Sequence, residues 1–398
     1  MSIQMKTYKF QLCPTKEQEV TLDNWLGATR FIYNLCLEYK TTAYKANGTS
    51  ISKNDIQKEL TIIRNETDWL KTVHSQTIQD VTDRLFTAYD NFFRRVKKGE
   101  TPGFPKFAKK ELWSSFRFKQ GVGLCENTNK VKLPKIGKVK FKKSQEVIGV
   151  IKNTSIKKEN KFWYICLTCE KETKHMKPNK FAIGLDLGIK ELLISSEGEV
   201  YNNPKTLYKW SKRLACAQKS LSRKVKGSNN RQEAKLRVSK LHKKIANIRK
   251  DNLHKVTTKI INENQVIICE DLKVSNMLKN HKLARSIADA SWTTLTNMLE
   301  YKSLWYGRTF MKVLPHHTSQ DCNVCGYRNA DLTLKVREWT CPDCNTHHDR
   351  DVNAAINILN KGMKKLTEAG HAFLTHGDIE LNRAEAWGPR EIIGATPQ

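Results

Sequence analysis

The 398-residue sequence predicts a multidomain α/β protein, and three observations support this prediction. Residues 16–97 repeat apolar side chains at the three-and-four spacing of amphipathic helices. Residues 101–172 carry short alternating runs between Pro and Gly turn signals, a pattern typical of a small sheet or barrel. Beyond residue 181, apolar strands alternate with helical stretches, as they do in α/β domains.

The composition indicates a globular protein with a polyanionic partner. A hydrophobic content of 39% is enough to bury real cores, and the formal charge of +30 makes nucleic acid the leading candidate partner. A membrane surface is the alternative, but we find no membrane-spanning apolar run, signal peptide or lipidation motif. We therefore expect a cytoplasmic protein that associates with the nucleoid when bound. The odd count of 11 cysteines favours a metal site plus reduced thiols over disulfides.

The first element predicted is a strand at 6–12, where polar and apolar residues alternate until Pro14. Helices follow over about 16–45 and 52–64, and a third begins at Ser75 as its cap and ends near residue 97. The opening strand has the same alternating polar and apolar pattern as residues 101–172. We therefore predict a barrel built from residues 1–14 and 101–172, with a helical domain at 15–100 inserted into it.

The second half of the chain reads as one α/β domain followed by a tail. The elements predicted in chain order are two strands within 181–200, helices within 205–259, a strand at 265–272, a helix containing Trp292 and Leu295, and a strand at 310–315. Residues 363–398 are polar, contain glycine and lack strong periodicity, so we expect a disordered tail.

The helical stretch at 205–259 is strongly basic, with 18 Lys or Arg against the two acids Glu233 and Asp251. A solvated helix face is the ordinary explanation of a charge run, but such faces usually mix signs. We favour contact with a nucleic-acid backbone, since rows of Lys and Arg on helices neutralise phosphates. The candidate contacts are Arg223, Lys224, Arg231, Lys235, Lys243 and Lys244.

Two Cys-x-x-Cys pairs, separated by fifteen residues, indicate a metal site. The four thiolates belong to Cys322, Cys325, Cys341 and Cys344. Two such pairs complete a closed tetrahedral site that suits structural zinc. His347 or His348 could replace a cysteine as a ligand, but since four thiolates are available we expect both histidines to face solvent or nucleic acid.

Three acids lie in unusual settings. Asp186 sits within a buried strand pattern, Glu270 ends another, and Asp351 opens a helical run that it can cap. Taken singly, Asp351 is explained as a helix cap, and Glu270 as a strand-end residue that meets solvent. Each of these explanations is at least as good as a catalytic role. Together, on so basic a protein, they predict a site for two Mg²⁺ or Mn²⁺ ions and phosphodiester hydrolysis. Their order along the chain is the one an RNase H-like nuclease needs.

These motifs resemble the TnpB proteins of bacterial insertion sequences, relatives of the miniature type V CRISPR nucleases. The matching stretches are GLDLGIK (184–190), ICEDLKVSNM (268–277), HTSQDCNVCG (317–326), REWTCPDC (337–344) and HDRDVNAAINIL (348–359), with looser matches upstream. The resemblance extends nearly end to end, up to about residue 362.

The resemblance implies a wedge barrel with an inserted helical recognition domain, at the boundaries given above. It also implies a RuvC-like nuclease domain at 181–315 and 349–362, interrupted by a zinc-binding insert at 316–348. The implied partners are a guide RNA transcribed from the transposon end and double-stranded target DNA. We expect no membrane partner, and we favour a monomer although the sequence does not determine the oligomeric state. Cleavage would occur next to a short target-adjacent motif.

By motif, Asp186, Glu270 and Asp351 match the catalytic acids and magnesium ligands of the family. Asp351 is preferred to Asp349 because the family's acid immediately precedes the x-Asn-Ala-Ala helix; Asp349 is the alternative. The four cysteines match the zinc ligands.

In the N-terminal half, Gln79 matches a position that faces target-motif DNA. Lys119 and Gln120 are further candidates for a nucleic-acid contact, with an ordinary surface position as the alternative.

The predicted function is therefore an RNA-guided, metal-dependent endonuclease acting on double-stranded DNA. The competing hypotheses are a non-cleaving RNA-guided DNA-binding repressor and an RNase H-like DNA transposase.

Overall fold

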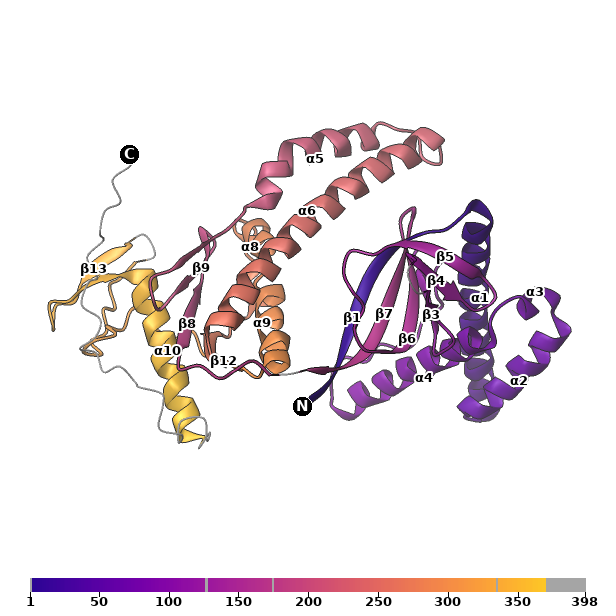
Figure 1. The fold of residues 1–398 in the computed structure, drawn as a ribbon, viewed down its shortest axis with the longest axis horizontal. Helices are drawn as coiled ribbons and strands as arrows, with labels where there is room; N and C mark the ends of the chain where they lie inside the picture. Colours follow the sequence, from indigo (N-terminus) through magenta and orange to yellow (C-terminus); the bar gives the residue numbers. More distant parts are fainter. Residues whose placement is uncertain (1, 126–127, 174, 334–335, 370–398) are drawn as a thin grey trace. The chain divides into compact units, whose positions relative to one another are not determined.

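The computed structural model describes residues 2–125, 128–173, 175–333 and 336–369. The chain forms two compact units, Met1–Thr173 and Lys174–Gln398, each with its own apolar cores (Figure 1). No helix among the residues described is both long and apolar enough to cross a membrane.

The first unit contains a seven-stranded antiparallel sheet. Its strands are β1 (Ser2–Cys13), β2 (Ser115–Phe118), β3 (Gly123–Leu124), β4 (Lys130–Leu133), β5 (Gly137–Lys142), β6 (Val150–Glu159) and β7 (Phe162–Thr173), in the order β2-β6-β7-β1-β5-β4-β3. β1 pairs with both β7 and β5, so the opening strand joins the later strands as predicted. In the described part of the chain the pairing runs from β2 to β3 without returning. Closure into a barrel therefore stays a prediction.

Four helices lie between β1 and β2 in the sequence: α1 (Lys16–Asn47), α2 (Lys53–Glu66), α3 (Asp68–Lys71) and α4 (Ser75–Lys97). Thr15 caps α1 through a capping box with Gln18, which fixes where the helix begins. The predicted cap of α4 was wrong by one residue: His74 is the N-cap, and it makes no side-chain capping bond. Trp25 of α1 packs against Phe116 and Phe118 of β2, so helices and sheet share one core.

The second unit is built on a mixed five-stranded sheet in the order β10-β9-β8-β11-β12. The strands are β8 (Ala182–Leu187), β9 (Glu191–Ser195), β10 (Val200–Asn202), β11 (Val266–Glu270) and β12 (Thr309–Val313). β8, β11 and β12 are parallel to one another, whereas β9 runs antiparallel to β8 and β10. The carboxyl ends of β8 and β11 therefore meet at one edge of the sheet.

Helices cover both faces of this sheet. One face packs on α6 (Asn229–Glu263) and α9 (Trp292–Tyr306) through residues such as Leu253 and Leu295. The other face packs on α10 (Arg350–Glu368) through residues such as Ile358. α10 lies so close to β8 that a Cβ on Gly184 would stand 2.1 Å from the carbonyl oxygen of Ala355.

The basic stretch forms the predicted helices, as a hairpin of α5 (Thr206–Ser222) and α6 (Figure 1). Leu214, Val238 and Ile245 form a small apolar cluster between the two helices, which leaves most of their cations facing outward. Two short helices, α7 (Val274–Met277) and α8 (Ala284–Ala290), precede α9.

A small cysteine-rich segment lies between β12 and α10 in the sequence. Its strands β13 (Glu338–Thr340) and β14 (His347–Asp349) pair antiparallel, and Trp339 packs with Cys322 and Cys341. α10 continues to Glu368, so the predictions that the domain ends at residue 362 and that a disordered tail begins at 363 were wrong. Residues 370–398 of the predicted tail lie outside the described residues.

Candidate metal centres and basic surfaces

The four predicted zinc ligands meet in space. Their sulfur atoms all lie within 4.8 Å of one another, and the Cys322–Cys344 and Cys325–Cys341 sulfurs are each 3.6 Å apart. Zn–S bonds of about 2.3 Å in a tetrahedron separate the sulfurs by about 3.8 Å, so the donor set fits structural zinc. In the described part of the chain, it is the one group of three or more metal-ligating side chains gathered this tightly.

The two histidines beside the zinc ligands differ. His347 is exposed as expected, but the prediction for His348 was wrong, because it is buried with Nε2 3.1 Å from Sγ of Cys322. The pairing of His348 with Trp339 across β13 and β14 turns its ring inward, where it contacts the Trp339 ring. His348 therefore supports a ligand from inside the fold, as partners of metal ligands commonly do.

Asp186 and Glu270 lie on neighbouring strands at the same sheet edge. The parallel register pairs Leu185 with Cys269, which places the next residue of each strand side by side. Glu270 is only 7% exposed, and burial raises its pKa, opposed by a hydrogen bond from Thr318. Burial, with the negative charges of Glu270 and Asp351, raises the pKa of Asp186 to about 8. Crowded, poorly hydrated carboxylates of this kind are stabilised by bound cations.

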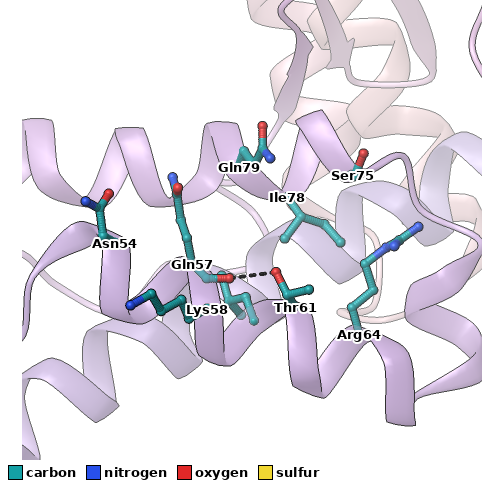
Figure 2. A pocket seen from close by; sticks show the side chains of 9 residues that line it. Asn54, Gln57, Lys58, Thr61, Arg64, Ser75, Ile78 and Gln79 are labelled. Atoms are coloured by element: carbon teal, nitrogen blue, oxygen red, sulfur yellow. Dashed lines mark hydrogen bonds between the residues drawn. The ribbon is translucent and has the colours of Figure 1, made fainter.

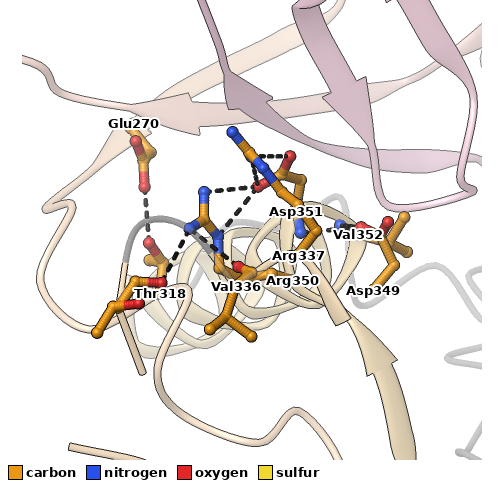
Figure 3. Close-up of polar contacts among 9 residues, drawn as sticks. Glu270, Thr318, Val336, Arg337, Asp349, Arg350, Asp351 and Val352 are labelled. Atoms are coloured by element: carbon orange, nitrogen blue, oxygen red, sulfur yellow. Dashed lines mark hydrogen bonds and ion pairs between the residues drawn. The ribbon is translucent and has the colours of Figure 1, made fainter. Parts of the chain in front are cut away.

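Asp351 lies in the first turn of α10 and is held by two arginines (Figure 3). Arg337 Nη1 donates to both of its oxygens, at 2.8 and 3.1 Å, and Arg350 donates to Oδ1 from Nε and Nη2. The charge of Asp351 raises the pKa of Asp186, so the third acid acts electrostatically on the first. Three carboxylates are hard oxygen donors of the kind that Mg²⁺ or Mn²⁺ prefers. Within the described residues, however, their oxygens are not gathered as tightly as the four cysteine sulfurs.

The structure also separates the two candidates for the third acid. Asp349, not Asp351, is the N-cap of α10: its Oδ1 accepts hydrogen bonds from the backbone N–H groups of Asp351 and Val352, both at 2.9 Å. The expectation that Asp351 could be the cap was therefore wrong. Asp349 thus serves as the helix cap, whereas the charge of Asp351 acts on Asp186 by raising its pKa, which favours Asp351 as the acid.

In the first unit, Gln79 is exposed beside an open groove of about 580 Å³ (Figure 2). The groove is lined by polar side chains of α2 and α4, among them Asn54, Gln57, Lys58, Arg64 and Ser75. Lys119 forms an ion pair with Asp83 of α4, and the backbone N–H of Gln120 donates to the Gln76 side chain at 3.2 Å. All three N-terminal candidates therefore lie on or against α4.

Most of the candidate cations of the hairpin face solvent. Arg223, Lys224, Lys235 and Lys244 are exposed, and Lys243 is partly buried. Arg231 differs, because its Nη1 donates to the carbonyl oxygens of Leu221 and Lys224 and so holds the turn between the helices. Sequence reasoning missed Trp210, whose ring lies 4.3 Å from Nζ of Lys244. An aromatic residue interleaved with cations is the signal that would have indicated it.

Comparison with known proteins gives matches along most of the chain. The OrfB_IS605 family, described as "Probable transposase", matches residues 164–281, the "Cas12f1-like, TNB domain" matches residues 292–358, and a "Helix-turn-helix domain" matches residues 1–49. The chain is 36% identical to the "Putative RNA-guided DNA endonuclease InsQ" of Escherichia coli K12, covering 98% of this chain and 99% of the relative. It is also 36% identical to the "Putative RNA-guided DNA endonuclease" of Streptomyces pristinaespiralis, covering 90% and 89%.

More distant matches include the TnpB-like protein L770 of Acanthamoeba polyphaga mimivirus, which is 23% identical over 89% of this chain and 73% of the relative. Among solved structures, CasPhi-2 (Cas12j) bound to crRNA matches with a TM-score of 0.46 at 10% identity, covering 90% of this chain and 98% of that one. The identity to InsQ extends over nearly the whole of both proteins. This chain therefore belongs to the TnpB family.

Proposed function

We propose that this protein is an RNA-guided endonuclease that cleaves double-stranded DNA beside a short target-adjacent motif. Its guide would be an RNA from the transposon end. The observation that supports this most directly is the position of Asp186 and Glu270 directly after the last paired residues of two parallel strands, with Asp351 in the first turn of the helix that packs against these strands. Both relatives that are 36% identical to this chain are named as putative RNA-guided DNA endonucleases.

The acid site would hold two Mg²⁺ or Mn²⁺ ions. When bound, such ions stabilise the attacking and the leaving oxygen of phosphodiester hydrolysis. Asp186 and Glu270 would bind from the rigid sheet edge, and Asp351 from the first turn of α10. Before metal binds, Arg337 and Arg350 neutralise Asp351, which limits the repulsion among the three acids. The mixed strand order of the second unit agrees with the RNase H-like, RuvC-type domain that we propose.

The basic hairpin of α5 and α6 would hold the guide RNA or its duplex with target DNA. Its exposed cations carry no sequence information, so base pairing would choose the target. The groove beside Gln79 would contact the short flanking motif, since its amide, hydroxyl and guanidinium groups can donate to or accept from base edges. One copy of the chain supplies all three acids.

The decisive experiment is cleavage of a plasmid carrying a matched target by purified protein, guide RNA and Mg²⁺. We expect Asp186→Asn, Glu270→Gln and Asp351→Asn each to reduce the rate by more than about 100-fold, beyond what loss of a merely supporting partner causes. Asp349→Ser is the matched control, because serine retains a capping oxygen for α10 and should retain cleavage.

The outcomes discriminate among the alternatives. Guided binding without cleavage by the wild-type protein would identify a non-cleaving binding protein, and joined transposon ends in place of breaks would identify a transposase. If Asp349→Ser were as damaging as Asp351→Asn, the third acid would have to be reassigned.

A further inference from the structure

The hydroxyl of Thr318 makes a direct contact with one of the proposed metal ligands. We propose that Thr318 is a positioning residue that orients the carboxylate of Glu270 for metal binding. This inference rests on the proposed function, because it gives Glu270 the role of a ligand in the acid site. It adds to that site a residue which is itself neither an acid nor a zinc ligand.

The contact is short and buried. Thr318 Oγ1 donates to Oε1 of Glu270 at 2.7 Å, and the two residues are 4% and 7% exposed (Figure 3). Hydroxyl bonds to an ionised carboxylate are among the stronger and more directional hydrogen bonds in proteins. Within the described residues the bond engages Oε1 alone, so Oε2 keeps its lone pairs for a cation.

The loop that carries Thr318 is fastened to α10 by two buried asparagines. Asn357 Nδ2 donates to the carbonyl oxygens of Thr318, at 2.9 Å, and Asp321, at 2.6 Å. Asn353 Nδ2 also donates to Asp321 O, at 2.8 Å, and its Oδ1 accepts from the backbone N–H of Asn323 at 2.9 Å. Four bonds from one helix leave this loop little freedom to move, so the Thr318 hydroxyl is held at a fixed point.

The same helix carries Asp351, and the fastened loop leads directly to the zinc ligand Cys322. One connected set of hydrogen bonds thus extends from Glu270 on β11, through Thr318, to the helix of the third acid. A glutamate side chain has several rotatable bonds, and repulsion from neighbouring Asp186 would tend to turn its carboxylate away. The Thr318 bond opposes that rotation and keeps Glu270 beside Asp186.

The test compares Thr318→Val, which keeps the side-chain shape but removes the hydroxyl, with Thr318→Ser, which keeps the hydroxyl. Mn²⁺ binding to the zinc-loaded, full-length protein without nucleic acid is measured from the electron paramagnetic resonance signal of free Mn²⁺. We expect Thr318→Val to lower the affinity for Mn²⁺ by about 10- to 100-fold, the usual effect of losing a partner of a metal ligand. The Ser variant should bind like the wild type, and Glu270→Gln defines complete loss of the ligand.

Guided DNA cleavage is the second readout. The single-turnover rate is measured as a function of Mg²⁺ concentration. The Mg²⁺ concentration that gives half the maximal rate should be higher for Thr318→Val than for the wild type, and the rate of this variant should approach the wild-type rate at high Mg²⁺. If the role of Thr318 were purely structural, the substitutions would instead lower the zinc content or the unfolding temperature. Their effect would then not depend on whether the new side chain has a hydroxyl. If Thr318→Val lowers the zinc content or the unfolding temperature, Thr318→Ala is used in its place, because alanine also lacks the hydroxyl and is too small to overfill the site.

Two results would overturn the inference. The first is wild-type Mn²⁺ affinity and Mg²⁺ dependence in variants without the hydroxyl, and the second is Mn²⁺ binding that does not change in Glu270→Gln. Failure of the proposed function looks different: wild-type protein would not cleave guided targets, while the loss of Mn²⁺ affinity in Thr318→Val would still support the positioning role.

Discussion

Lys302 shows what a single buried cation does to the stability of the second unit. It is 6% exposed, and its Nζ donates to the carbonyl oxygen of His254 at 3.0 Å and to the hydroxyls of Thr257 and Thr258, each at 2.7 Å. All three partners are neutral. Burial therefore lowers the pKa of Lys302 from 10.5 to about 8, because the charged form loses hydration without gaining an opposite charge.

This shift predicts a pH dependence of stability. Between about pH 8 and 10.5 the unfolded chain keeps the Lys302 proton and the folded chain releases it, so the free energy of unfolding rises with pH. Below pH 8 both states are protonated and the contribution is constant. The unfolding free energy of the wild type minus that of Lys302→Met should thus increase with pH, by at most about 1.4 kcal/mol per pH unit across this window. Urea unfolding at pH 7.5, 9 and 10 measures it, and a difference independent of pH would contradict the assignment.

At the same scale, the sequence indicated that Asp186 and Glu270 share a sheet edge, but it did not indicate which residues contact them. The catalytic role of the acids stays a prediction. Asp186 and Glu270 could be identified because a carboxylate inside an apolar strand pattern is conspicuous. Thr318 could not be identified, because its bond to Glu270 spans 48 residues and depends on how a loop folds onto α10. The choice of Asp349 as helix cap depends on its extended backbone conformation, which residue type alone does not determine.

At the scale of elements, the close packing of α10 on the sheet positions Asp351, which we propose as the third acid. Gly184 permits this approach, because the backbone of α10 occupies the space that a side chain there would need. Gly362 does the same from the helix side, where a Cβ would meet the Ile268 side chain at 2.4 Å. Two glycines therefore set the distance between α10 and the strands that carry Asp186 and Glu270.

Gly184→Ala should consequently destabilise the protein by more than about 3 kcal/mol, above the usual cost of overpacking, because the clash is with backbone that cannot rotate away. Gly123→Ala is the matched control, since its Cβ would enter open space in a strand of the first unit. Thermal unfolding of both variants provides the measurement. A Gly184→Ala protein as stable as the control would show that α10 can shift away from β8 at little cost.

Local periodicity predicted most long elements but not their arrangement. The predicted helix at 16–45 is α1, and the predicted strand at 265–272 contains β11, because each carries its own repeat of apolar residues. The four-residue α3 was missed because it is shorter than one helical repeat pattern. The order β10-β9-β8-β11-β12 depends on contacts between distant segments, which a single sequence does not display.

For the whole molecule, charge is the dominant property, and it is unevenly distributed. The formal charge is +30, and residues 205–259 alone contribute 18 cations against two acids. The hairpin that they form leaves most of these cations exposed, so most remain available to phosphates. Affinity for nucleic acid should therefore fall steeply with salt, because each phosphate contact releases counterions.

The salt dependence gives a quantitative test of the hairpin. Replacing exposed Lys235 and Lys244 together by Gln should reduce the slope of log affinity against log salt by about 1.4 to 1.8, as two phosphate contacts are lost. The corresponding double Arg variant keeps both charges and should keep the wild-type slope. Fluorescence anisotropy with labelled guide RNA across a salt series measures both. An unchanged slope in the Gln variant would exclude these lysines as phosphate contacts.

The position of α10 near the end of the described chain has a consequence for biosynthesis. The ribosome makes β8 and β11 well before residues 341–351, which supply the second zinc pair and the third acid. A nascent or truncated chain that stops before this segment has Asp186 and Glu270 but cannot complete the acid site. If the proposed function is correct, a chain that stops before Asp351 should not cleave DNA.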